Sequence, residues 1–138
     1  MEQDPKAIMQ RFYKEVINGR NLDLIDEVMS ADFIEHEEVP GLAPGPEGAK
    51  QFFAMVQTGF PDFQMNVEDI LAEGDKVVVR SRLTGTHKGE FMGVPASDKS
   101  IDVSVIDIVR VADGKVAEHW GVTDTAAMME QLGALPPA

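Results

Sequence analysis

One carboxylate interrupts an apolar stripe of this sequence. In the segment 101–111 the odd positions are Ile101, Val103, Val105, Asp107, Val109 and Val111. Alternation with a period of two predicts a β-strand with one buried face, and Asp107 falls in the middle of that face. Burying a carboxylate is costly unless a cation or a donor compensates it. Asp107 therefore has a structural partner, is turned outward by a bulge, or acts as an acid or base in a pocket.

The turn after this strand decides which residue faces Asp107. If Asp113-Gly114 forms a two-residue type I′ turn, Asp107 lies opposite Trp120. If Ala112-Asp113-Gly114 forms a three-residue loop, Asp107 lies opposite His119. The sequence alone leaves both registers open. An Asp–His pair in a dry cleft would make a general acid–base unit.

Other polar side chains could join this site. Glu35 and His36 are neighbours on a short extended segment, so only one of them can point inward, and the pattern does not choose between them. Tyr13 could offer its hydroxyl to a ligand or pack in the core. His87 ends a strand beside a loop and is interpreted as structural.

The elements that position these residues follow from periodicity and capping. Helices are predicted at 4–16, 22–29, 46–59 and 124–132, and strands at 33–36, 63–72, 76–87, 101–111 and 116–123. The segment 39–46 is rich in Pro and Gly and is predicted to be a loop. Helices followed by an antiparallel meander indicate an α+β fold, in one domain spanning 1–138, with helices on one face of a sheet.

Composition narrows the class of protein. The formal charge is −12, which disfavours binding to nucleic acid. The chain has no cysteine, so it has no disulfide and no thiol nucleophile, and this fits a cytoplasmic location. Neither a signal peptide nor a membrane span is expected from the apolar pattern.

Motifs that would indicate a metal or a cofactor are missing from the sequence. The histidines at 36, 87 and 119 match no metal-ligand spacing, and no nucleophile elbow or phosphate-binding loop is present. We therefore predict no metal and no cofactor.

A series of short motifs runs along nearly the whole chain. They are Phe60-Pro61-Asp62, the segments 72–77 and 85–95, Asp113-Gly114-Lys115-Val116, Glu118-His119-Trp120 and Gln131-Leu132-Gly133. In this order and spacing they resemble the SnoaL-like polyketide cyclase family of the NTF2-like superfamily.

The resemblance implies a fold and a chemistry. The fold is an NTF2-like cone, in which a curved antiparallel sheet packs on three N-terminal helices plus a short C-terminal helix, and the outer sheet face makes a homodimer or higher assembly. Cyclases of the family close polyketide rings by an intramolecular aldol reaction without metal or redox cofactor. Their catalytic Asp lies two residues after the histidine of the final strand, where this chain has Gly121. The partner position on the preceding strand, often His, is Asp107 here.

The predicted function is that of a cofactor-independent acid–base enzyme acting on a small hydrophobic carbonyl compound, as a cyclase or isomerase. Asp107 would be the base, assisted by His119 and by Glu35 or His36. One alternative is an epoxide-hydrolase-like enzyme, which needs Glu35 to point inward with Asp107, and another is a non-catalytic dimeric scaffold that binds a small molecule. The expected substrate-binding residues are Tyr13, Phe53, Phe91, Met92, Val105, Trp120 and Gly121.

Overall fold

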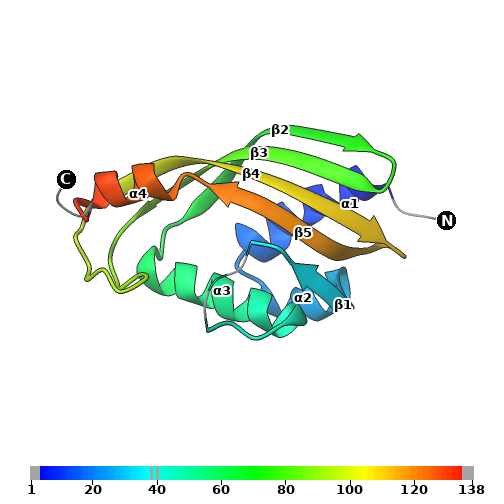
Figure 1. Ribbon diagram of the computed structural model, residues 1–138, viewed down its shortest axis with the longest axis horizontal. Coiled ribbons are helices and arrows are strands. Elements are labelled where there is room, and N and C mark those ends of the chain that lie inside the picture. The colour runs from blue at the N-terminus through cyan, green and yellow to red at the C-terminus, as the bar shows by residue number, and fades with distance from the viewer. Residues whose placement is uncertain (1–3, 38, 40, 135–138) are drawn as a thin grey trace.

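The computed structural model describes residues 4–37, 39 and 41–134; Pro40, part of the predicted loop, lies outside them. Five strands form one curved sheet in the order β1-β5-β4-β3-β2 (Figure 1). Their bounds are β1 Met29–Glu35, β2 Gln64–Glu73, β3 Lys76–Thr86, β4 Ser100–Ala112 and β5 Lys115–Thr123. The four long strands are antiparallel as expected, whereas the short edge strand β1 pairs with β5 in parallel.

The sheet curves over the N-terminal helices (Figure 1). The helical segments are α1 Pro5–Arg11, the π-helix η1 Phe12–Ile17, the 3₁₀ turn η2 Leu22–Leu24, α2 Ile25–Val28, α3 Gly45–Gly59 and α4 Thr125–Leu132. These helices and the sheet confirm the predicted α+β class. Over the described residues, none of the helices combines the length and the apolar character that a membrane crossing needs.

The first predicted helix begins as expected and then changes its winding. The Asp4 side chain accepts a hydrogen bond from the backbone N–H of Lys6 and caps α1, with Pro5 in its first turn. From Phe12 onward the helix widens, and the N–H of Asn18 donates to the carbonyl of Tyr13, five residues back. Such π-turns are rare and are frequently found at functional sites, and this one carries Tyr13.

The alternation predicted for the long strand is present in β4. Its odd residues are buried and its even residues are largely exposed, and Asp107 is 7% exposed on the buried face. The same inner face continues on β3 with Val77, Val79 and Leu83, against which the helices pack. Asp107 is therefore directed toward the helices, and the outward-turned alternative is wrong.

The β4–β5 hairpin has a register that neither predicted turn produces. Asp113 and Gly114 both have positive φ, at 53° and 75°, in a two-residue turn closed by Ala112 and Lys115. A bulge in β5 then inserts Ala117 between the pairs made by its neighbours, and it shifts the register by one residue. Neither predicted cross-strand pairing of Asp107, with Trp120 or with His119, is therefore present, because the turn type fixes the register only as far as the bulge.

Candidate active site

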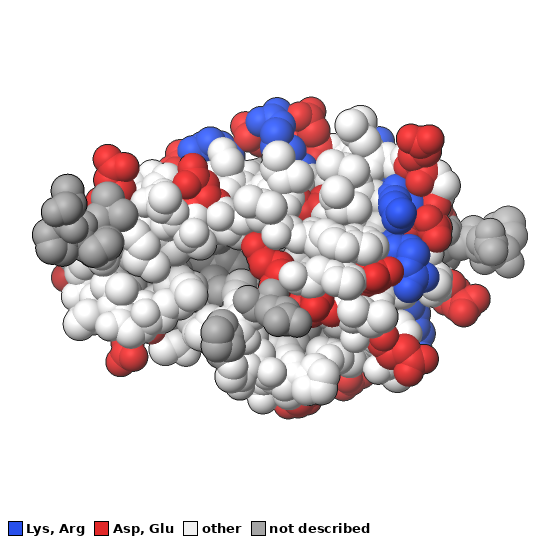
Figure 2. Space-filling model, viewed as in Figure 1, with Lys and Arg blue, Asp and Glu red and all other residues white. Residues whose placement is uncertain are grey.

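A cavity of about 890 Å³ lies between the inner sheet face and the helices. Its wall is mostly apolar, with aromatic side chains from α3 and η1, and three of the expected substrate-binding residues, Tyr13, Phe53 and Val105, line it. Figure 2 shows acidic side chains near the middle of one face of the molecule, whereas Lys and Arg lie toward the top and the right of that view. The volume falls in the range of small-molecule sites.

Asp107 lies directly opposite Gly121 in the sheet, and it reaches His119 diagonally along β5. Its Oδ1 lies 2.7 Å from Nε2 of His119, and its Oδ2 accepts a 2.6 Å hydrogen bond from the hydroxyl of Tyr13. The predicted Asp107–His119 contact is thus present, although the two residues do not form a direct cross-strand pair. Two donors stabilise the negative charge of this buried carboxylate.

His119 lies between two carboxylates. Nε2 meets Asp107, and Nδ1 meets Glu35 from the end of β1. Burial alone would lower the pKa of His119, but the hydrogen bonds and charges of Asp107 and Glu35 outweigh it and raise that pKa to about 10. The imidazole is therefore a cation at neutral pH, with both of its N–H groups donating.

Burial and the neighbouring Asp107 also keep the hydroxyl of Tyr13 protonated. Burial, followed by the charge and the hydrogen bond of Asp107, raises the pKa of the Tyr13 hydroxyl well above its usual range. The hydroxyl is therefore a donor to Asp107 at any ordinary pH.

The structure separates Glu35 from His36. Glu35 points toward the cavity, as the hydrolase alternative required, and contacts His119 there. His36 lies on the outer sheet face, where its ring stacks on Trp120 at 4.9 Å and its Nε2 meets Glu118 at 2.6 Å. Neighbouring residues of an extended segment point to opposite faces, so Glu35 faces the cavity and His36 faces the outer side of the sheet. His36 and Trp120, on which it stacks, therefore do not reach the cavity.

Two more expected substrate-binding residues lie elsewhere. Phe91 is buried against Phe60, with ring centroids 5.1 Å apart, and forms a local bridge with Val94. Met92 is half exposed in the turn between them. Neither lines the cavity, because the short turn folds this connection back onto α3.

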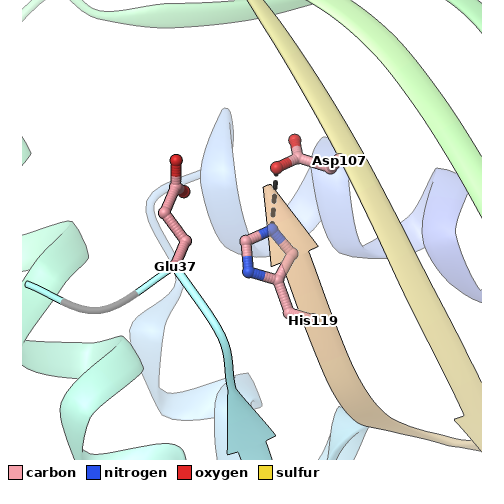
Figure 3. Close-up of side chains that lie close together, drawn as sticks. All are labelled: Glu37, Asp107 and His119. Atoms are coloured by element: carbon pink, nitrogen blue, oxygen red, sulfur yellow. Dashed lines mark hydrogen bonds and ion pairs between the residues drawn. The ribbon is translucent and has the colours of Figure 1, made fainter. Parts of the chain in front are cut away.

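Glu37 is the residue that sequence reasoning missed. It lies two residues beyond β1, lines the cavity and converges with Asp107 and His119 (Figure 3). Its parity is that of Phe33 and Glu35, so extending the alternation of β1 by two positions would have placed it on the inner face. Burial raises its pKa; the His119 cation opposes this, while the charges of Asp107 and Glu35 add to it.

Gly121 leaves the space in which these side chains meet. A Cβ at this position would lie 2.8 Å from Asp107 Oδ1, 2.8 Å from His119 Cε1 and 2.9 Å from Glu37 Oε1. Such distances are shorter than ordinary contacts to carbon. Gly121 therefore contributes to the site by lacking a side chain rather than by touching a ligand.

Glu37, Asp107 and His119 also have the side-chain types that bind metals. Each offers one ligand atom, and these atoms lie within 4.8 Å of one another. Both nitrogens of His119 already donate to carboxylates, so an ion would have to displace one of those hydrogen bonds. The arrangement fits a proton-transfer network, and the absence of a metal stays a prediction.

The chain belongs to the SnoaL-like polyketide cyclase family, whose model matches residues 7–132. Nogalonic acid methyl ester cyclase of Streptomyces nogalater is 26% identical over 119 residues, which cover 84% of this chain and 88% of that relative. Aklanonic acid methyl ester cyclase DauD of Streptomyces sp. (strain C5) is 28% identical, over 87% of this chain and 78% of the relative.

Solved structures agree with this assignment. TsrD from Streptomyces laurentii has a TM-score of 0.87 and 28% identity, over 97% of this chain and 100% of that chain. IdmH from Streptomyces antibioticus has a TM-score of 0.82 and 32% identity, over 95% of this chain and 99% of that chain. The predicted family and NTF2-like fold are confirmed, and the relatives support a cyclase-type function.

Proposed function

We propose that this protein is a cofactor-independent acid–base enzyme that closes a ring in a hydrophobic carbonyl compound by an aldol-type reaction. One observation carries the proposal: the carboxylate of Asp107 is held by His119 and Tyr13 at the wall of an apolar cavity. The apolar wall limits the access of water, so a bound substrate can lie against the lone pairs of Asp107 that His119 and Tyr13 leave free.

Asp107 takes a proton from the carbon next to a carbonyl. An ionised carboxylate offers about four lone-pair positions, and His119 and Tyr13 occupy two of them. The cationic ring of His119 stabilises the enolate electrostatically, and Glu35 holds that ring in place through Nδ1. The enolate carbon then attacks a second carbonyl of the same molecule.

The substrate class follows from the cavity and from the relatives. Its wall is largely apolar, and its volume of about 890 Å³ suits a polycyclic or partly folded polyketide. The two curated relatives are named as cyclases of the methyl esters of nogalonic acid and aklanonic acid. A neutral polyketide ester also suits a protein whose formal charge is −12.

The test is turnover by wild type and Asp107→Asn, using polyketide esters chosen by thermal-shift screening. We expect Asp107→Asn to remain folded, since the amide oxygen still accepts from Tyr13, and to lose about 10²–10⁴-fold in kcat. Asp102→Asn makes the same substitution on the outer face of β4 and should leave turnover unchanged. Full activity of Asp107→Asn would overturn the proposal.

The epoxide-hydrolase alternative required Glu35 to point inward, and Glu35 does line the cavity. Glu35 and Asp107 both face the cavity, but His119 lies between them, so they do not share one water-sized position as epoxide hydrolysis requires. The product separates the two functions, because hydrolysis of an epoxide in ¹⁸O-labelled water yields a labelled diol and the aldol reaction incorporates no oxygen. Ligand binding without turnover would indicate the non-catalytic scaffold.

We also propose that the chain forms a homodimer through its outer sheet face. Large apolar side chains are exposed there, among them Val122 at 73% and its cross-strand neighbour Ile106 at 47%. Ile106→Glu with Val122→Glu should halve the mass measured by light scattering, whereas Gln10→Glu on α1 should not. An unchanged mass in the double variant would contradict this interface. The cytoplasmic location and the absence of nucleic-acid and membrane partners stay predictions.

A further inference from the structure

Glu37 lines the cavity, and none of the reaction steps proposed above involves its carboxyl group. It follows β1, it is partly buried, and its Oε2 lies 3.4 Å from the hydroxyl of Thr123 on β5. Figure 3 shows the carboxyl group of Glu37 beside the imidazole of His119, with Asp107 at the Nε2 of the same ring. The ligand atoms of Glu37 and Asp107 lie within 4.8 Å of each other, so a substrate bound against Asp107 would also lie near Glu37.

The surroundings of the two carboxyl groups differ. Asp107 accepts hydrogen bonds from a cation and from a phenol at 2.7 and 2.6 Å. Among the described residues, the long contact to Thr123 is the one hydrogen bond of the Glu37 carboxyl group, because both N–H groups of His119 are already used by Asp107 and Glu35. A carboxyl with weak donors and two carboxylate neighbours favours its protonated form.

The groups that face Glu37 come from four elements. Glu35 from β1 and Asp107 from β4 disfavour a negative charge on it, whereas His119 from β5 favours one. Tyr13 from η1 is uncharged and donates to Asp107. Burial and the two carboxylates outweigh the cation, so the pKa of Glu37 is raised. Within the described part of the chain, Asp107 has two strong donors and Glu37 has none, and such unequal surroundings are the arrangement in which one carboxyl group acts as base and the other as acid.

We infer that Glu37 is the general acid of this site and donates its proton to the carbonyl oxygen that becomes the new hydroxyl group. This inference rests on the proposed aldol reaction and adds the residue that completes it. The space beside Gly121 lets the three side chains meet, because a Cβ there would lie within 2.9 Å of each of them and at least one would have to shift.

The proton balance closes without any other reactant. Asp107 accepts a proton from carbon, and the electron pair of that C–H bond forms the enolate. The enolate carbon bonds to the second carbonyl carbon, and the oxygen of that carbonyl takes the proton of Glu37. Asp107 then holds a proton and Glu37 holds none. The distance of at most 4.8 Å between their ligand atoms suits return of the proton through a single water or the product hydroxyl.

Glu37→Gln tests the inference, because an amide can hydrogen bond to the carbonyl but cannot transfer the proton. We expect kcat to fall by about 100-fold or more, with KM within a few fold. The wild-type rate should decline as pH rises through the pKa of Glu37, and this decline should be lost in the variant. Glu37→Asp should recover part of the rate. Glu73→Gln, on the exposed end of β2, is the matched control and should behave as wild type.

The outcomes separate this inference from the proposed function. Loss of turnover in Asp107→Asn, together with wild-type kcat and pH profile in Glu37→Gln, overturns the role of Glu37 alone. Absence of turnover in the wild type overturns the proposed function. A ¹³C NMR titration then still tests Glu37: we expect its carboxyl to titrate above the ordinary value of 4.5, and titration at or below that value overturns the inference.

Discussion

Two buried histidines of this protein have opposite surroundings. His119 lies between the carboxylates of Asp107 and Glu35 at the edge of a cavity. His87 is 0% exposed, its Nδ1 lies 2.9 Å from the hydroxyl of Ser97, and its ring stacks on Phe60 at 5.3 Å. Among the described residues, no partner meets the Nε2 of His87.

The difference shows what makes a buried histidine chemically useful. Two carboxylates and an adjoining cavity make His119 a cation at the edge of a space that can hold a small molecule. At His87 the Nδ1 atom accepts the backbone N–H of Ser97, and the ring stacks on Phe60. The structural interpretation of His87 agrees with these contacts.

The largest expected difference between the two histidines is in catalysis. His119→Gln removes the cation that stabilises the enolate and leaves Asp107 and Glu35 without their shared partner, so we expect kcat to fall by about 10²-fold or more. His87→Gln should keep kcat near wild type and lower the free energy of unfolding by about 1–3 kcal/mol, because it disturbs a buried, hydrogen-bonded position. Turnover assays and thermal melts of both variants measure this contrast. Equal losses of kcat in His119→Gln and His87→Gln would contradict a catalytic role for His119 alone.

A smaller effect is expected in the pH dependence of stability. The folded-state pKa of His119, about 10, lies above the ordinary 6.5, so the stabilisation that His119 contributes is fully present below pH 6.5 and is lost as pH rises toward 10. The raised pKa of Glu37 acts in the same direction at lower pH. Melting temperatures from pH 6.5 to 10 should fall in wild type and in His87→Gln, and less steeply in His119→Gln. Equal slopes in all three proteins would contradict the charged state of His119.

The sequence was most informative where a residue's neighbours along the chain decide its environment. The alternation of the segment 101–111 placed Asp107 on the buried face, and the cap at Asp4 placed the start of the first helix. The pattern could not choose between Glu35 and His36, because both parities of that segment contain an apolar residue. It also expected Trp120, Phe91 and Met92 at the pocket, where the structure has none of them.

The sequence by itself thus determined the family, the α+β class and the unusual carboxylate of the central strand, because these depend on short motifs and on a period of two. Only the tertiary structure decided the partners of Asp107. A bulge at Ala117 shifted the register, and the absence of a side chain at Gly121 leaves room for Glu37 beside Asp107 and His119. Tyr13 reaches Asp107 from η1. Contacts between elements distant in sequence depend on register and packing, which no local pattern encodes.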